Sequence, residues 1–475
     1  QHHGITGLLK ERSEPTVTMN TLDAEKRSIR NGDLVHIMNE RGRVTMRALV
    51  TDDIIQGSVD ANMGGGGPVG PEKWQNCNIN ELTDLQRYDP ISGFPVYKTL
   101  LCEVVRVSEE DAKVVIDSGE YGDTSGRDDS LRKEQTVKER IYLDHNATTP
   151  IDREVKKIML QYVENGYGNP SSIYAEGKDA RFAVDSARRS VGQLLNCTAR
   201  RIIFTGSGSE ANNLAIKGVA FANWKSKNHI ITTSIEHPSV LNTCKWLERH
   251  GFTVTYLKND TRRSINPDDL KSAITERTCL VSVMMANNET GSIQPVEELV
   301  RVAKERNVLF HSDCVQAIGK IPIDVADLGV DLLTISGHKL YGPKGIGALY
   351  IRKGVVLEPL VNGGKQEGGL RAGTENIIGI VGLGKAAELA VQRIHEMDRV
   401  KRMRNKLEKG IRSLIAEARL NINSESRLPN TLNMTLPGIR GESVVLALDQ
   451  QGVSLSSGSA CRSGSPKPSH TLLAM

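Results

Sequence analysis

Lys339 is the residue whose setting most clearly suggests chemistry. It ends the turn Ser-Gly-His-Lys at residues 336–339, directly after the apolar run 331–335, which we interpret as a buried strand. Ligands of open α/β sheets bind at the carboxyl ends of such strands. A partly buried lysine there can lose its proton and form a Schiff base, although a loop lysine taken alone is more often a solvated side chain.

Three further polar residues follow other predicted strands, which span 229–233, 280–284 and 308–312. Asp313 could keep a heteroaromatic nitrogen protonated, Asn288 could donate to a ring hydroxyl, and His237 could stack on a flat ring and move protons. Each residue also has an ordinary alternative, as a helix N-cap, a turn residue or a loop histidine. When the three residues are considered together with Lys339, a functional role is favoured over these alternatives.

A Gly/Ser loop at residues 205–210 connects the strand predicted at 201–204 to a helix predicted at 211–220. Its backbone N–H groups, its hydroxyls and the positive end of the helix dipole are suited to a phosphate group. The loop matches neither a Walker motif nor the Gly-x-Gly-x-x-Gly fingerprint. Phosphate loop, carboxylate, amide, imidazole and lysine together are the set that a pyridoxal 5'-phosphate site needs.

One further group could react. Cys461 lies in the small, polar, glycine-rich stretch 455–466. A free cysteine is usually a small buried hydrophobe, but no apolar sequence surrounds this one. We therefore expect an exposed nucleophile on a loop, with Arg462 favouring its thiolate form.

The elements that must position these groups alternate along residues 141–475 as strands and amphipathic helices, such as the helix predicted at 295–305. This alternation predicts an α/β fold with a mostly parallel sheet covered by helices on both faces. Residues 1–108 instead have a β texture, with a hairpin predicted from 33–38 and 43–50, and we expect a small β-barrel domain. The charged segment 109–140 between the two is interpreted as a linker.

Composition excludes several classes of protein. The 475 residues contain 61 Lys+Arg and 57 Asp+Glu without a dense basic tract, so nucleic acid is not an expected partner. Seven scattered cysteines without a Cys-x-x-Cys pair argue against a metal site built by spacing and fit a reducing compartment. No apolar run is long enough to span a membrane and no secretory signal opens the sequence, which predicts a cytoplasmic protein.

The second part of the chain closely resembles cysteine desulfurases of the NifS/IscS type. The resemblance runs from residue 141 to the end and rests on the Cys461 loop and on residues 143–150, 168–172, 210–213, 236–237, 287–289, 313–316, 336–339 and 370–376. It implies a homodimer of the aspartate-aminotransferase-like fold (fold type I) that uses pyridoxal 5'-phosphate. It further implies conversion of L-cysteine to L-alanine, with a persulfide on Cys461 that passes to an acceptor protein for iron–sulfur clusters or another sulfur-containing cofactor.

The same resemblance implies a role for each site residue. Lys339 would bind the cofactor covalently and, with His237, move protons. His237 would stack on the ring and Asp313 would pair with its nitrogen. The remaining residues would contact other parts of the cofactor. Asn288 and Gln316 would contact the ring hydroxyl. The phosphate would be bound by Gly208, Ser209, Ser336 and His338 of the same chain and by Thr374 of the partner subunit.

Two departures from this family pattern bear on activity. Lys365 stands where the pattern has a third glycine. The family also continues beyond the equivalent of Met475 to an arginine that binds the substrate carboxylate, so we expect a truncated small domain and reduced turnover. Two alternatives therefore stay open. The chain could be a weakly active fusion that serves as a scaffold or binding module, or it could be a related enzyme such as a selenocysteine lyase. Cys461 argues against an aminotransferase.

Residues 1–108 resemble a different family, the C-terminal domain of molybdopterin oxidoreductases of the formate dehydrogenase type. The resemblance rests on residues 2–7, 23–24, 29–35, 41–42, 80–83 and 89–95. In that family the domain is a β barrel that helps to bind the pterin dinucleotide. The large domains that hold the metal are not part of this sequence, so we do not expect a complete molybdenum cofactor here. A β module retained in a fused gene is the alternative.

Overall fold

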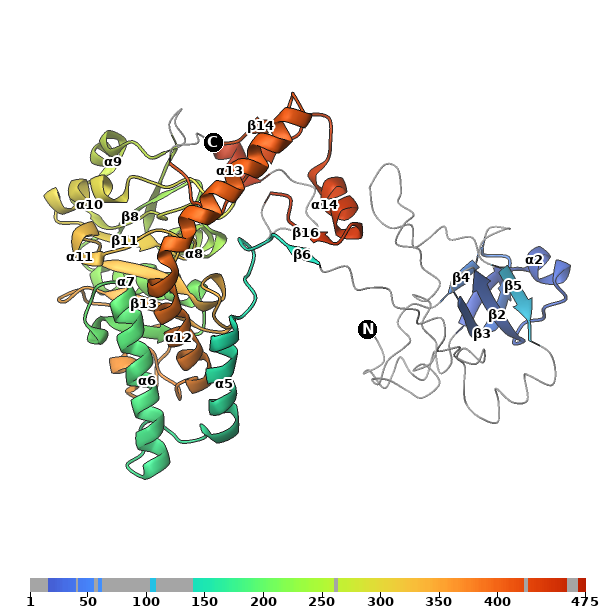
Figure 1. The fold of residues 1–475 in the computed structure, drawn as a ribbon, viewed down its shortest axis with the longest axis horizontal. Coiled ribbons are helices and arrows are strands. Elements are labelled where there is room, and N and C mark those ends of the chain that lie inside the picture. The colour runs from blue at the N-terminus through green and yellow to red at the C-terminus, as the bar shows by residue number, and fades with distance from the viewer. Residues whose placement is uncertain are drawn as a thin grey trace. The chain divides into compact units, whose positions relative to one another are not determined.

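A computed structural model describes residues 16–39, 42–54, 59–61, 103–107, 140–259, 264–422, 426–458 and 469–475. The chain divides into two compact units, residues 1–139 and 140–475, and Figure 1 shows the fold of each. No helix in these described ranges is long and apolar enough to cross a membrane. Cys461, the predicted nucleophile, and the segment 109–139, most of the predicted linker, lie outside the described residues.

The first unit contains a five-stranded sheet in the order β4-β1-β3-β2-β5. A hairpin joins β2 to β3, β1 runs parallel to β3, and β4 and β5 form the edges of the described sheet. The prediction of a small β domain with this hairpin is confirmed, although barrel closure is not seen among the described strands. Its elements are β1 (Thr16–Asn20), α2 (Thr21–Lys26), β2 (Leu34–Asn39), β3 (Gly42–Thr51), β4 (Val59–Ala61) and β5 (Glu103–Arg106).

The second unit is built on a seven-stranded sheet in the order β7-β13-β12-β11-β10-β8-β9. All neighbouring pairs are parallel except those of β13, which is antiparallel to both β12 and β7. The predicted mostly parallel sheet is confirmed. The strands are β7 (Ile202–Thr205), β8 (His229–Thr233), β9 (Thr253–Leu257), β10 (Thr278–Ser282), β11 (Leu309–Asp313), β12 (Leu332–Ser336) and β13 (Gly347–Ile351).

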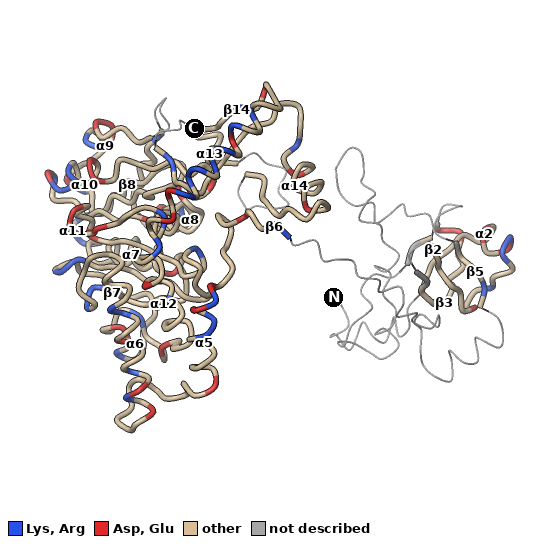
Figure 2. The backbone as a smooth tube through the Cα atoms, in the orientation of Figure 1, with Lys and Arg blue, Asp and Glu red and all other residues tan. Residues whose placement is uncertain are grey.

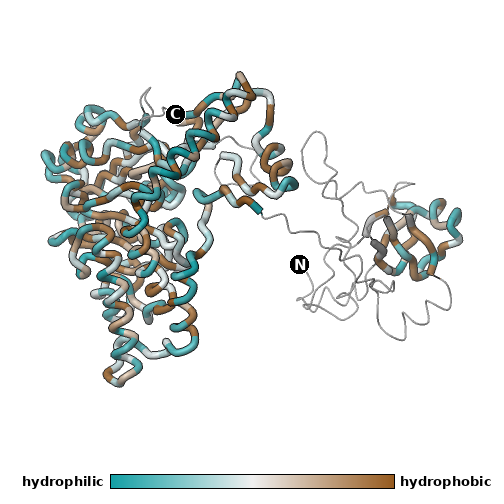
Figure 3. The backbone as a smooth tube through the Cα atoms, viewed as in Figure 1, coloured by the Kyte–Doolittle hydropathy of each residue, from teal (hydrophilic) through white to brown (hydrophobic). Residues whose placement is uncertain are grey.

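Alternate residues of these strands enter two separate cores, one on each face of the sheet, because successive side chains of a strand point to opposite faces. Leu333 and Ile335 of β12 join one core, while Leu332 joins the other. Both faces are therefore apolar, and the strands appear as hydrophobic segments inside a charged shell of helices (Figures 2 and 3). Helices α5 (Arg153–Asn165), α6 (Ala175–Leu194), α10 (Val296–Glu305) and α12 (Ile377–Arg393) contribute to the first core, and α7 (Gly208–Asn223) and α8 (Pro238–Glu248) to the second.

Past α12 the chain leaves the large sheet along α13 (Met397–Leu414) and forms a smaller substructure (Figure 1). There β16 pairs with β6 in parallel, which brings residues near position 454 beside the beginning of the unit. The other elements of the unit are α9 (Pro267–Ala273), α11 (Val325–Leu328), α14 (Gly441–Gln450), α15 (His470–Ala474), β6 (Ile141–Tyr142), β14 (Arg419–Leu420), β15 (Met434–Thr435), β16 (Val453–Ser454) and the short turns η3 (Ala199–Arg201), η4 (Gly337–Lys339), η5 (Gln366–Gly369) and η6 (Ile394–Glu396).

Candidate active site

Lys339 ends the turn η4 that follows β12, as the sequence predicts. Gly337 makes this turn possible, because a Cβ there would stand 2.8 Å from both the Pro343 carbonyl oxygen and the Ile346 side chain. The Lys339 side chain is buried, and Nζ donates to the carbonyl oxygen of Ala147 at 2.7 Å and to that of Asn146. The lysine is therefore a held, desolvated amine rather than a solvated loop residue.

Asp313 ends the neighbouring strand β11 and is also buried. Its Oδ2 accepts a 2.7 Å hydrogen bond from Nδ2 of Asn212, and its Oδ1 accepts from the backbone N–H of Val315 at 3.0 Å. The second bond is the turn-capping role that the sequence left open. It uses only Oδ1, so Oδ2 can bind the Asn212 side chain of α7.

His237 caps the start of α8, where its Nδ1 accepts from the backbone N–H of Ser239 at 3.1 Å. The neutral ring therefore carries its proton on Nε2. Burial lowers the pKa of His237 below its ordinary value; Asp313 opposes this shift, and the charges of Lys339 and His470 reinforce it. The imidazole is thus neutral at physiological pH.

Asn212 connects these groups, although the sequence assigned it no role. Its Nδ2 also donates to Oγ of Ser239 at 2.9 Å, and that hydroxyl lies 2.7 Å from Nδ1 of His237. The Oδ1 atom of Asn212 is buried and has no hydrogen-bond partner among the described residues. Asn212 falls within the motif 210–213, which was the only sequence signal available for it.

The predicted phosphate loop lies against the end of β12. Helix α7 begins at Gly208, and its N-cap Ser207 accepts from the backbone N–H of Glu210 at 3.1 Å. A Cβ on Gly208 would stand 3.1 Å from Cβ of Ser336, so glycine permits this close approach. Ser209 is exposed and Ser336 buried. The first free N–H groups of α7 and the Ser336 hydroxyl thus share one edge of the sheet.

Two more predicted residues lie beside Lys339. Nε2 of Gln316 donates to the Asn146 carbonyl oxygen at 2.9 Å, so this carbonyl accepts from both Gln316 and Lys339. His338 lies next to Lys339 in the chain, and its Nδ1 is 3.2 Å from Oγ1 of Thr148. Burial, and then the charge of Lys339, lowers the pKa of His338 to about 4.

Lys320 is a second buried lysine at this edge, and sequence reasoning missed it. Its Nζ donates to the carbonyl oxygen of Gln316 at 2.8 Å and to Oε1 of the same residue at 3.2 Å. Burial lowers the pKa of Lys320 to about 7, and the charge of Lys339 acts in the same direction. No local pattern marks a lysine whose burial results from the packing of distant elements.

The remaining predicted residues do not join this group directly. Asn288 is half-buried in the turn after β10, and Thr374 is exposed on the segment 366–376. Lys365, the residue in place of a family glycine, is exposed and has room for its side chain. Cys461 and Arg462 lie outside the described residues.

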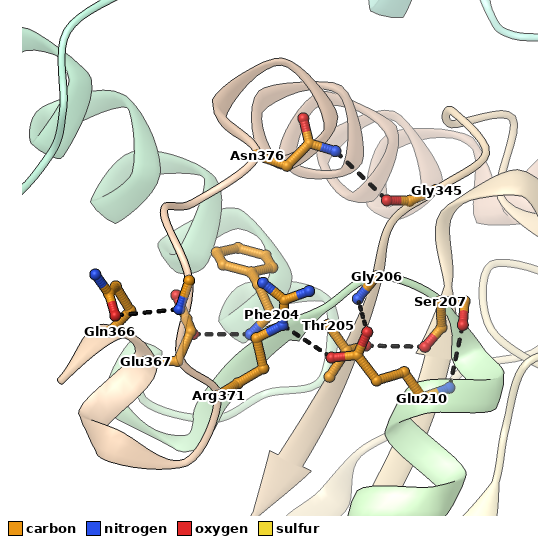
Figure 4. Close-up of polar contacts among 11 residues, drawn as sticks. Phe204, Thr205, Gly206, Ser207, Glu210, Gly345, Gln366, Glu367, Arg371 and Asn376 are labelled. Atoms are coloured by element: carbon orange, nitrogen blue, oxygen red, sulfur yellow. Dashed lines mark hydrogen bonds and ion pairs between the residues drawn. The ribbon is translucent and has the colours of Figure 1, made fainter. Parts of the chain in front are cut away.

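The segment 366–376 is bonded to the phosphate loop through Arg371 and to the preceding strand β7 through Glu367 (Figure 4). Arg371 Nε donates to Glu210 Oε1 at 2.9 Å, and Glu210 Oε2 accepts from the Gly206 N–H at 2.8 Å. Glu367 is buried and accepts from the backbone N–H of Phe204 at 2.8 Å and from Arg188 through two 2.6 Å bonds. Exposed Thr374 is therefore carried by a firmly held segment.

The donor set suits pyridoxal phosphate. A helix N-terminus with hydroxyls can bind the phosphate, Asp313 offers a carboxyl group to the ring nitrogen, and Lys339 offers an amine. The orphaned Oδ1 atom of Asn212 adds a buried acceptor without a partner among the described residues. The residues present thus fit the cofactor that the sequence predicts.

Comparison with known proteins agrees with this arrangement. Residues 141–475 match the family described as Aminotransferase class-V, and residues 1–101 match the Molydopterin dinucleotide binding domain. Cysteine desulfurase IscS of Dictyoglomus turgidum is 47% identical over 340 residues, which cover 71% of this chain and 86% of that protein. Cysteine desulfurase IscS of Methanosarcina thermophila is 50% identical over 340 residues, covering 71% and 84%.

Solved structures are similar over the same part of the chain. A protein described as NifS-like aligns with a TM-score of 0.67 at 41% identity and covers 70% of this chain and 89% of its own. A second, described as SspA in complex with cysteine, aligns with a TM-score of 0.62 at 39% identity and covers 70% and 94%.

Proposed function

The chain belongs to the class-V aminotransferase family and, within it, to the cysteine desulfurases; from this premise we propose that residues 140–475 bind pyridoxal 5'-phosphate and convert L-cysteine to L-alanine. The observation that carries the proposal is the convergence of Lys339, Asp313, His237 and the loop 205–209 on one edge of the sheet. The domain at residues 1–101 belongs to the molybdopterin dinucleotide binding type.

When bound, pyridoxal phosphate supplies an electron-poor ring that stabilises negative charge at the substrate α-carbon. The protein's contribution begins with Asp313, whose carboxylate would keep the ring nitrogen protonated. Asn212 fixes that carboxylate through its 2.7 Å bond. His237 would lie on the ring face, held by Ser239, with its proton on Nε2.

Lys339 is assigned the covalent bond to the cofactor and, with His237, proton transfer at the α-carbon. Its burial and its bonds to two carbonyl oxygens hold Nζ in place. Gln316 and Asn288 are assigned to the ring hydroxyl, and Gly208, Ser209, Ser336 and His338 to the phosphate. The N–H groups at the start of α7 support the phosphate assignment, because anions bind there.

Cys461 is proposed as the group that takes the sulfur. Its thiolate attacks the substrate sulfur, so that an S–S bond forms as the Cβ–S bond breaks, and the carbon fragment leaves as alanine after taking up protons. The persulfide sulfur then passes to an acceptor thiol by exchange. Acceptors in iron–sulfur cluster or other cofactor assembly fit this chemistry.

We further propose a homodimer, in which Thr374 of the partner subunit completes the phosphate site. Large apolar side chains exposed on one side of the unit support this assembly, since such patches mark interfaces. They are Leu160, Val163, Tyr167, Ile173, Tyr174 and Phe182.

The free cysteines support a reducing compartment such as the cytoplasm. Those among the described residues are Cys197, Cys244, Cys279 and Cys314.

Single-turnover release of alanine from L-cysteine, recorded with the absorbance of the lysine-bound cofactor, tests the proposal. The wild-type chain should show the band and release alanine in proportion to sites. Lys339→Ala should lose the band, while Cys461→Ala should keep the band and lose alanine release. Cys197→Ser is the control, because burial raises the pKa of this thiol to about 11 and leaves it inert.

The outcomes separate the parts of the proposal. A wild-type chain with neither band nor alanine would contradict the desulfurase function. A Cys461→Ala variant that still released alanine at the wild-type rate would contradict only the role of that cysteine.

A further inference from the structure

Glu210 is a carboxylate at the place where the cofactor phosphate is expected. It lies in the first turn of α7, its N–H donates to the N-cap Ser207, and its Oε2 accepts from the Gly206 N–H at 2.8 Å. A carboxylate here favours the helix, since it faces the positive end of the dipole. It also places negative charge beside the site of a phosphate dianion, and like charges at short range repel.

Arg371 supplies the compensating charge from a segment far away in the chain. Its Nε donates to Glu210 Oε1 at 2.9 Å, and Glu210 in turn raises the pKa of Arg371 above its ordinary value. Both side chains are about one quarter exposed, Arg371 at 28% and Glu210 at 25%. Arg371 Nη2 would be 3.7 Å from a Cβ built on Gly206, so the guanidinium lies alongside the loop (Figure 4).

The backbone that carries Arg371 is itself fixed to the strand leading into the loop. Glu367 adopts a positive φ of 48°, is buried, and accepts from the Phe204 N–H in β7 as well as from Arg188. The Arg188 guanidinium also lies 4.7 Å from the centre of the Phe204 ring. Arg371 is thus delivered to Glu210 by a rigid segment and does not lose much conformational freedom in the pair.

We propose that Arg371 is a positioning residue for the cofactor phosphate: it neutralises Glu210 and thereby makes the loop 205–209 receptive to a dianion. Glu210 closes the loop through Gly206, and Arg371 removes the electrostatic cost of that closure. This inference rests on the proposed function, because it assumes that pyridoxal phosphate occupies the site.

Equilibrium binding of pyridoxal phosphate and of pyridoxal, which lacks the phosphate, to the apoprotein of residues 1–475 tests the inference. We expect Arg371→Met to weaken pyridoxal phosphate binding about tenfold and to leave pyridoxal within about twofold, because only the phosphate meets the uncovered carboxylate. In a background that carries Glu210→Gln, Arg371→Met should weaken pyridoxal phosphate binding less than about threefold. Arg371→Lys, which keeps the charge, should stay within about threefold of wild type.

Arg352→Met is the matched control. It removes another arginine–carboxylate pair, Arg352 with Asp331, which lies at the opposite end of the strands, where β12 begins. This variant should leave the ratio of the two affinities unchanged.

Several results would overturn the inference. Equal weakening of both ligands by Arg371→Met would indicate a purely structural role. A loss from Arg371→Met that is the same with and without Glu210→Gln would indicate that Arg371 acts independently of the carboxylate. If Arg371→Met does not fold, two other variants test the inference. The inference then fails if either Arg371→Lys or Glu210→Gln lowers the preference for pyridoxal phosphate over pyridoxal tenfold or more. A wild-type chain that binds neither ligand would instead contradict the proposed function.

Discussion

Glu236 shows how strongly the site environment acts on a single residue. It directly precedes His237 and is fully buried; its Oε1 accepts from the Met284 N–H and the Thr233 hydroxyl, both at 2.8 Å. Oε2 has no partner among the described residues, and burial raises the pKa of this carboxyl to about 8. Glu236 is therefore a neutral acid at physiological pH.

Replacement of Glu236 by Gln should change the pH dependence of stability. Between pH 4.5 and about 8 the folded wild-type protein keeps a proton that the unfolded chain releases, so this residue's contribution to the free energy of unfolding falls as pH rises. Glu236→Gln cannot titrate, and its stability relative to wild type should increase by up to about 1.4 kcal/mol per pH unit in that window. Urea unfolding of both proteins at pH 5.5 and 8 measures the difference, and a constant difference would refute the assignment.

Residue types alone identified much of the site. Asp313 ends strand β11 and Lys339 follows strand β12; both side chains are buried at the carboxyl ends of these strands, which lie together because the strands are parallel. Asn212 and Lys320 carried no comparable local signal, since the contact of Asn212 to Asp313 and the burial of Lys320 depend on packing between elements.

At the scale of elements, the close packing of α6 against α12 depends on a small residue. A Cβ on Gly384 of α12 would stand 2.6 Å from both Cα and Cβ of Ala187 in α6. Backbone lies on the other side of this contact, so neither helix can accept a methyl group without moving apart.

Gly384→Ala should therefore destabilise the protein by about 1–3 kcal/mol in spite of the better helix propensity of alanine. Gly410→Ala in α13 is the control, because a Cβ there meets nothing within 4 Å and should stabilise by about 0.5–1 kcal/mol. Thermal unfolding of the two variants should shift in opposite directions; a stabilised Gly384→Ala would contradict the packing argument.

Strand β13 is one of the elements that the sequence analysis did not anticipate. Its residues 347–351 form a short apolar run like those of the other strands. Nothing in this run indicates whether the strand lies parallel or antiparallel to its neighbours. Only the connection 337–346 decides that it runs antiparallel to β12, since a parallel return needs a crossover of a dozen or more residues. A Cβ on Gly347 would also stand 2.5 Å from the Ser207 backbone, so β13 packs directly against the phosphate loop.

At the scale of the whole molecule, the exposed apolar patch on α5, α6 and their connection bears on assembly. Ile173 and Tyr167 are 87% and 81% exposed, which is an unfavourable setting in an isolated unit. A second copy of the chain covering this patch would bury both.

Ile173→Asp should therefore shift the proposed dimer toward monomer, because the new carboxylate would be desolvated in the interface. Leu414→Asp is the control, since Leu414 is 86% exposed at the end of α13, away from the patch. Analytical ultracentrifugation over a range of protein concentrations measures the change. If Ile173→Asp and Leu414→Asp associate like wild type, the patch is not the interface.

Residue patterns alone indicated that the chain has a β-rich first part and an α/β second part, and they singled out Lys339, Asp313, His237 and the loop 205–210. Those features are local: hydrophobic period, turn residues and polar groups at strand ends. Only the tertiary structure decided that Arg371 neutralises Glu210, that Lys320 is buried beside Gln316 and that Asn212 joins His237 to Asp313. The pairs Arg371–Glu210 and Asn212–Asp313 link residues distant in the chain, and the burial of Lys320 depends on how other elements pack around it.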